Sequence, residues 1–121
     1  MTISTLLQVI VAFTLLFVWL VQARKFTPYR GGNAQSLRQE FAVYGLPEWS
    51  LFVVGGLKIG AAVALLVGVG VQALVLPAAL LLCVLMIGAI AMHVKVADPI
   101  KKALPASALL FFCASIALLN R

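Results

Sequence analysis

The fold is decided by residues 50–94, which read SLFVVGGLKIGAAVALLVGVGVQALVLPAALLLCVLMIGAIAMHV. Lys58 and His93 are the only acidic or basic residues in this run. A membrane-spanning helix needs about 20 apolar residues, so the run is too long for one span and fits two. We therefore predict helices at about 50–70 and 74–94. The break between them is expected at residues that disfavour a continuous helix or suit a new first turn: Gly68, Gly70, Gln72 and Pro77.

Two further apolar runs flank this segment. Residues 3–21 carry no charge, and they are long enough to cross a hydrocarbon core of roughly 30 Å. A secretory signal peptide is the alternative, because Val21-Gln22-Ala23 resembles a cleavage site, but no positive segment precedes Ile3. Near the other end, Pro105 opens an apolar run that continues to Leu119. We predict retained helices at about 3–23 and 103–119.

The composition agrees with a membrane protein. The chain is 64% hydrophobic and only 10% charged, whereas soluble domains are about 25% charged. Lipid must therefore solvate most of the apolar surface. We predict an all-α membrane protein with one domain, residues 1–121, built as an antiparallel bundle of four transmembrane helices.

The long polar stretch between the first two spans has its own pattern. Within about residues 34–45, apolar side chains recur at helical spacing, Gly45 suits a helix stop, and Pro47 prevents continuation. We predict a short amphipathic interfacial helix there, lying at the membrane surface. Trp49 follows as an expected interface anchor.

The charges predict the orientation. The net charge is +6, and seven cations lie in the first and third connections, namely Arg24, Lys25, Arg30, Arg38, Lys95, Lys101 and Lys102. Because these basic residues lie in loops beside apolar runs, we expect them to orient the protein in the membrane and not to bind nucleic acid. The positive-inside rule places both charged loops in the cytoplasm and both termini outside. Arg24 and Lys25 then anchor the end of the first span.

Lys58 and His93 are the candidate polar intramembrane site. A charge inside a span is costly unless it is paired, hydrated or able to reach the interface. Lys58 has small neighbours at Gly55 and Ala62, which leaves room for an anion or a polar headgroup, and a proton-linked amine is the other functional interpretation. The alternative is a lysine that extends to the cytoplasmic interface. His93 lies on the same half of the bilayer, with Glu40, Glu48 and Asp98 as possible partners.

Other residues suggest packing more than chemistry. Cys83 and Cys113 fall at similar depth in an antiparallel hairpin, so a thiol pair is conceivable, although buried cysteines usually act as small hydrophobic residues. Small residues recur at every fourth position of the second span and predict close approach of another helix, either within the chain or from a second subunit: Gly56, Gly60, Ala64 and Gly68. The sequence shows no catalytic motif and no metal-ligand spacing.

Several segments in order resemble the DoxX-like family of small four-helix membrane proteins. They are Arg24-Lys25-Phe26, then FAVYGLPEW at 41–49, VGGLKIGA at 54–61, MIGA at 86–89 running to His93, and ALPA at 103–106. The resemblance implies a four-helix bundle in the bacterial inner membrane. Some members resemble subunits of thiosulfate:quinone oxidoreductase, others are tied to oxidative-stress complexes, and a distant eukaryotic branch acts as cargo receptors. Many relatives carry Glu at the position of Lys58, so a mechanism based on a membrane carboxylate is not carried over.

Three functions follow as hypotheses. The first is an accessory or assembly subunit that holds a protein partner in the bilayer, with a quinone-linked redox complex as the suggested partner, and that contacts quinone or lipid beside Lys58 and His93. A homo-oligomer is the alternative to a protein partner. The second is a small transporter of an anionic or weak-acid solute, because Lys58 would repel a cation. The third is a small oxidoreductase acting on quinone or through the two thiols. An enzyme is the less favoured class, and no bound cofactor is expected.

Overall fold

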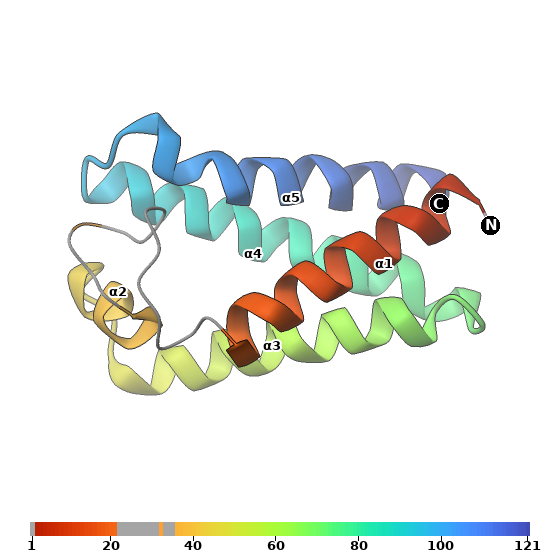
Figure 1. The fold of residues 1–121 in the computed structure, drawn as a ribbon, viewed down its shortest axis with the longest axis horizontal. Helices are drawn as coiled ribbons and strands as arrows, with labels where there is room; N and C mark the ends of the chain where they lie inside the picture. The colour runs from red at the N-terminus through yellow and green to blue at the C-terminus, as the bar shows by residue number, and fades with distance from the viewer. Residues whose placement is uncertain (1, 22–31, 33–35) are drawn as a thin grey trace.

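The computed structural model describes residues 2–21, 32 and 36–121 (Figure 1). In this part of the chain the elements are α1 (Ile3–Leu16), the π-helical turn η1 (Phe17–Val21), α2 (Leu37–Val43), α3 (Glu48–Val67), the 3-10 turn η2 (Gln72–Leu74), α4 (Val75–Lys95) and α5 (Ile100–Leu119). Four helical segments are long and apolar enough to cross a membrane. The predicted all-helical class with four spans is confirmed.

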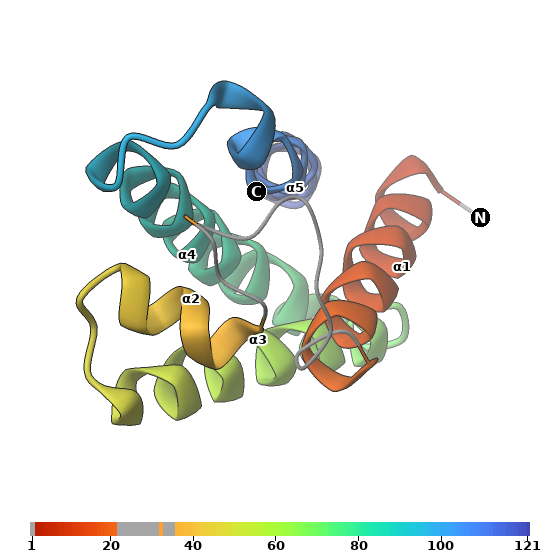
Figure 2. The ribbon, with the colours of Figure 1, turned by 60° about the vertical axis from the view of Figure 1, so that its left-hand side comes forward.

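The four long helices form an antiparallel bundle. α3 packs on α1 and α4, and α5 packs on α4 and α1, so the helices follow one another around the bundle in the order α1, α3, α4, α5. Figure 2 shows these four helices at the corners of the bundle, with α2 beside α3. Both chain ends lie at one end, whereas α2 and the α4–α5 connection lie at the other (Figure 1). We call these the terminal end and the loop end.

The apolar core lies in the terminal half of the bundle. α1 contributes Val11, Ala12 and Leu15, and α3 contributes Ala61, Ala62 and Leu65 from its second half. The remaining members come from the first half of α4 and the second half of α5, namely Val75, Ala78, Ala79, Leu82, Met86, Cys113 and Ile116. Many of these residues are small, which allows the helices to approach closely.

Helix boundaries differ from the sequence expectations at one proline. α5 begins at Ile100 and not near residue 103, so Pro105 lies inside the helix and does not open it. Pro99 supplies the extended residue before the helix, and the chain turns helical directly after it. Pro105 removes only the backbone bond to Lys101, close to the helix start, where the interruption is tolerated. Residues 22 and 23 of the first predicted helix lie outside the described part.

α2 falls inside the range predicted for a short helix. The Ser36 hydroxyl caps its start by accepting a hydrogen bond from the Gln39 backbone N–H at 3.3 Å. Gly45 ends the helix with a positive φ of 77°, the left-handed conformation that glycine adopts at little cost. The location of this helix at the membrane surface stays a prediction.

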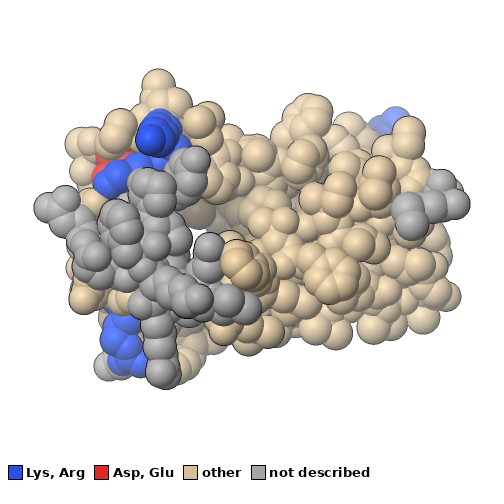
Figure 3. All heavy atoms as spheres, viewed as in Figure 1, with Lys and Arg blue, Asp and Glu red and all other residues tan. Residues whose placement is uncertain are grey.

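Cationic side chains gather at the loop end. On the face shown in Figure 3, blue Lys and Arg atoms lie around α2 and the start of α5, and a single blue group lies at the other end. Arg121 is the cation at the C-terminus. Arg24, Lys25 and Arg30 lie outside the described residues. The described cations therefore have the asymmetry on which the predicted orientation rests.

Candidate functional site

Lys58 lies near the middle of a membrane span. It is the tenth residue of the 19-residue apolar segment Trp49–Val67. It shares a helix face with the buried Ala62 and Leu65, while Gly56 and Gly60 lie on the exposed side of α3. The ammonium therefore belongs to the face of α3 that looks into the bundle, and the Lys58 residue itself is half-buried.

Trp19 covers this lysine. The Lys58 Nζ atom lies 5.3 Å from the centre of the Trp19 ring, within the range of a cation–π contact. A side chain on Gly55 would meet the Trp19 ring at 2.7 Å, so glycine is required for this close approach. Trp19 belongs to the π-helical turn η1, a rare geometry that is often found at functional sites. Sequence reasoning singled out Lys58 but missed its aromatic partner.

Ring contacts through Phe41 of α2 and Tyr44, the residue that follows α2, link Trp19 to His93. The Phe41 ring meets the Trp19 ring at a centroid distance of 6.2 Å, and the Tyr44 ring meets the His93 ring edge-on at 5.9 Å. Phe41 and Tyr44 also contact each other, and both are buried. The structure therefore connects the two predicted polar residues through a row of rings and does not place them in direct contact.

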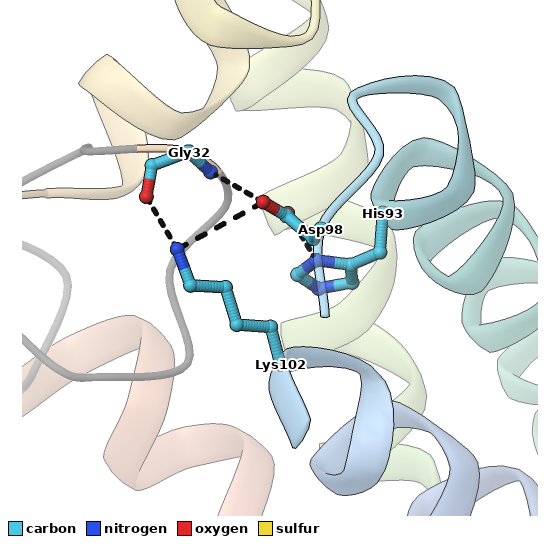
Figure 4. Close-up of polar contacts among 4 residues, drawn as sticks. All are labelled: Gly32, His93, Asp98 and Lys102. Carbon is cyan, nitrogen blue, oxygen red and sulfur yellow. Dashed lines mark hydrogen bonds and ion pairs between the residues drawn. The ribbon is translucent and has the colours of Figure 1, made fainter. Parts of the chain in front are cut away.

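His93 is bonded to Asp98 in the α4–α5 connection (Figure 4). The His93 Nδ1 atom lies 2.8 Å from Asp98 Oδ2, and both side chains are less than 10% exposed. The second carboxylate oxygen accepts the Gly32 backbone N–H at 3.0 Å and lies 3.8 Å from Lys102 Nζ. Lys102 also donates to the Gly32 carbonyl oxygen. We call His93, Asp98, Lys102 and Gly32 the ionic cluster.

The charge of Asp98 is stabilised in this cluster. Burial alone raises the pKa of a carboxyl group. The His93 hydrogen bond, the Gly32 N–H and the Lys102 ammonium outweigh burial and hold the Asp98 pKa below its ordinary value of 3.8. Asp98 is therefore ionised at neutral pH, and it ties α4, α5 and residue 32 together.

The backbone aims Asp98 at His93. α4 ends in a two-bond cap in which the Asp98 N–H donates to the His93 carbonyl and the Ala97 N–H donates to the Val94 carbonyl. This cap needs a left-handed residue, and Ala97 takes that position with φ 57°. The same pair of bonds ends α2, where Gly45 holds the equivalent position. The Lys95 ammonium joins the two helix ends by donating to the Tyr44 carbonyl oxygen at 2.7 Å.

Comparison of the chain with models of known protein families gives a match. The model of the DoxX-like family matches residues 6–115, which is most of the chain. The chain belongs to the DoxX-like family. Comparison with curated proteins and with solved structures gave no match. The matched residues include every described member of the ionic cluster and both Trp19 and Lys58.

The DoxX-like chain has a second polar network, at the terminal end, which the sequence analysis missed. The Gln8 side chain donates to the Leu65 carbonyl oxygen at 3.0 Å and accepts from the Ser4 hydroxyl at 2.8 Å. Asn120 donates to the Ser4 hydroxyl oxygen at 2.8 Å and pairs with the Gln72 amide. The Leu65 carbonyl lies in the last turn of α3, where carbonyls lack helical partners. We call these four side chains the amide network.

The small-residue stripe of this DoxX-like protein faces outward over part of its length. A side-chain carbon added to Gly56 or Gly60 would meet no neighbouring atom of the described residues within 4 Å. Ala64 is half-buried, and only Gly68 packs closely, against Val75 of α4. Among the described residues, Gly68 therefore has a close neighbour in α4, whereas Gly56 and Gly60 have none. Whether the stripe serves packing within the chain or against a second subunit stays a prediction.

The roles of the remaining candidate residues stay predictions. Cys83 and Cys113 are free thiols, and Cys83 packs against the core that contains Cys113. Their use as a redox pair stays a prediction, as does the anchoring role of the exposed Trp49. Arg24 and Lys25 lie outside the described residues. In residues 2–21, 32 and 36–121 no group of His, Cys, Asp and Glu side chains could hold a metal ion.

Proposed function

We propose that this DoxX-like protein is an accessory membrane subunit that packs against a protein partner in the bilayer. The observation that supports this is the open face of α3, where Gly56 and Gly60 have no neighbour within side-chain reach among residues 2–21, 32 and 36–121. Membrane helices associate through such small residues because the two backbones can come close together. A quinone-linked redox complex is the partner that we expect, and a second copy is the alternative.

Co-purification tests this proposal. The tagged chain would be extracted from its native membrane in a mild detergent and run on a native gel, with bound proteins identified by mass spectrometry. We expect Gly60→Leu to release the partner, because the larger side chain separates the helices. Val84→Leu, on the exposed side of α4, is the matched control and should retain it. A lone monomer for the wild-type chain would contradict the proposal.

A second candidate function is a carrier for an anionic or weak-acid solute. The inward position of Lys58 in the middle of a span favours it, because a fixed cation there attracts anions and repels cations. Uptake of a radiolabelled weak acid into proteoliposomes should be lost in Lys58→Met and kept in Lys101→Met, whose lysine is exposed at the loop end. Equal uptake in both variants would contradict the carrier.

We further propose the orientation that the charges predict. The loop end, with Arg38, Lys95, Lys101 and Lys102, would face the cytoplasm of a bacterium, and both termini would lie outside the inner membrane. A reporter that is active only outside the cytoplasm, fused after Arg121, should be active. Activity of a cytoplasm-only reporter at that site would reverse the orientation.

A further inference from the structure

The Lys58 ammonium lacks an oxygen partner in the part of the chain that the structure describes. It can donate three hydrogen bonds, yet no oxygen among the described residues accepts one, and its close contact is the Trp19 ring. Glu40 on α2 acts on it only through charge. An ammonium in an apolar setting costs several kcal/mol unless its charge and its donors are satisfied. The described residues therefore supply no hydrogen-bond acceptor for this ammonium.

An anionic group would satisfy this ammonium best. The four spans carry no acidic side chain, and Asp98 is already bonded to His93 and Lys102. A carboxylate or phosphate oxygen satisfies an ammonium better than a neutral acceptor does, because charge assists the hydrogen bond. The Lys58 residue is half-buried, so the described part of the chain does not enclose its side chain completely.

The residues around Lys58 also favour a ligand with an apolar part. The Trp19 ring lies on the ammonium, and its apolar neighbours on this face of α3 are Gly55, which packs under that ring, and the buried Ala62. Phe41 of α2 packs against the Trp19 ring. A small hydrophilic anion would lose its hydration there without gaining comparable contacts. An anion with an alkyl chain keeps that chain among apolar neighbours and brings only its head to Lys58.

We propose that Lys58 and Trp19 form a binding site for an amphipathic anion, with the oxyanion head on the ammonium and the alkyl chain in the bilayer. The head chemistry is shared by a free long-chain carboxylic acid and by an acidic phospholipid. The inference rests on the second candidate function in that it names the solute class of the carrier. Binding can be measured without transport, so failed transport with retained binding would remove the carrier and leave the site.

Trp19 provides its own signal for the test. The chain contains two tryptophans, so Trp49→Phe leaves Trp19 as the only one. The full-length variant would be purified in dodecyl maltoside and titrated with dodecanoate while Trp19 emission is recorded. We expect a saturating change with dodecanoate and none with dodecanol, which has the same chain and no charge. An equal change with dodecanol would overturn the proposal.

Substitutions assign the effect to Lys58. In the same background, Lys58→Met should weaken dodecanoate binding by about tenfold or more, because a charge-assisted bond is lost. Lys58→Arg should restore most of it, and Lys101→Met should leave it within about twofold. Unchanged binding in Lys58→Met would overturn the proposal. If that variant does not fold, the unsubstituted chain decides: dodecanoate must raise its melting temperature while dodecanol does not.

Vesicles distinguish the two sources of the anion. The same Trp19 variant would be placed in phosphatidylcholine vesicles with or without phosphatidylglycerol. If phosphatidylglycerol abolishes the dodecanoate response, the acidic lipid occupies the site. If the response persists, the site selects a free acid. A chain that responds to neither anion has no such site.

Discussion

The polar groups at the two ends of the bundle are satisfied by different kinds of side chain. At the loop end, the buried Asp98 carboxylate interacts with the His93 imidazole, a backbone N–H and the Lys102 ammonium. At the terminal end, neutral amides and a hydroxyl connect α1, α3 and α5. Both networks satisfy polar groups where helices end and hydrogen bonds within the helix run out. The difference predicts that only the loop end responds to charge and pH.

The largest expected effect comes from removing the centre of the ionic cluster. Asp98→Ala leaves His93 Nδ1, the Gly32 N–H and Lys102 without their shared acceptor. We expect the free energy of unfolding to fall by about 2 kcal/mol, because buried partners of a charge lose their bonds. Thermal unfolding of the purified chain, followed by circular dichroism in detergent, would measure this. A melting temperature equal to that of the wild type would show that the cluster is not structural.

Acid should weaken the loop end specifically. The pKa of Asp98 is lower in the folded chain than its ordinary value of 3.8, so the carboxylate stabilises the fold above that value. This contribution is lost as the pH falls through the folded pKa, at most about 1.4 kcal/mol per pH unit. Melting temperatures between about pH 6 and pH 3 should fall more steeply for wild type than for Asp98→Asn. Parallel curves would exclude Asp98 as the source.

Loss of the amide network at the terminal end should lower stability by the same amount at every pH. Gln8→Leu leaves the Leu65 carbonyl and the Ser4 hydroxyl without the Gln8 amide. We expect a loss of about 1 kcal/mol, since hydrogen bonds between membrane helices are individually modest. The decline of melting temperature with acid should keep its wild-type slope in this variant. A changed slope would mean that the two ends are coupled through the bundle.

The smallest effect should be a gain in stability. Ala97 holds a left-handed conformation that costs a residue with a side chain about 1 kcal/mol. Ala97→Gly should therefore stabilise the chain by up to that amount, and Gly45→Ala, at the matching position of α2, should destabilise it similarly. Thermal unfolding of the two variants in parallel would check the opposite signs. A loss of stability in Ala97→Gly would mean that the strain at residue 97 is not what limits this cap.

Local sequence determined much of the architecture. The length of residues 50–94 requires two spans, and hydrophobic length depends on nothing beyond the residues themselves. The stop at Gly45 and the turn after Gly68 were also predictable, because glycine marks helix ends through its own backbone freedom. Pro105 was misassigned, since a proline close to the start of a helix is tolerated once the helix packs.

The sites required the tertiary structure. The sequence contains three carboxylates that could pair with His93. Asp98 is the one that reaches it, because the helix cap at Ala97 turns the chain back toward His93. The sequence shows that the Lys58 charge is unfavourable inside a span. Its partner Trp19 lies 39 residues earlier and reaches Lys58 only because α1 packs on α3 beside Gly55. Hydrophobic length belongs to a single segment, whereas a contact depends on which faces of two segments meet, and that is set by the packing of the whole bundle.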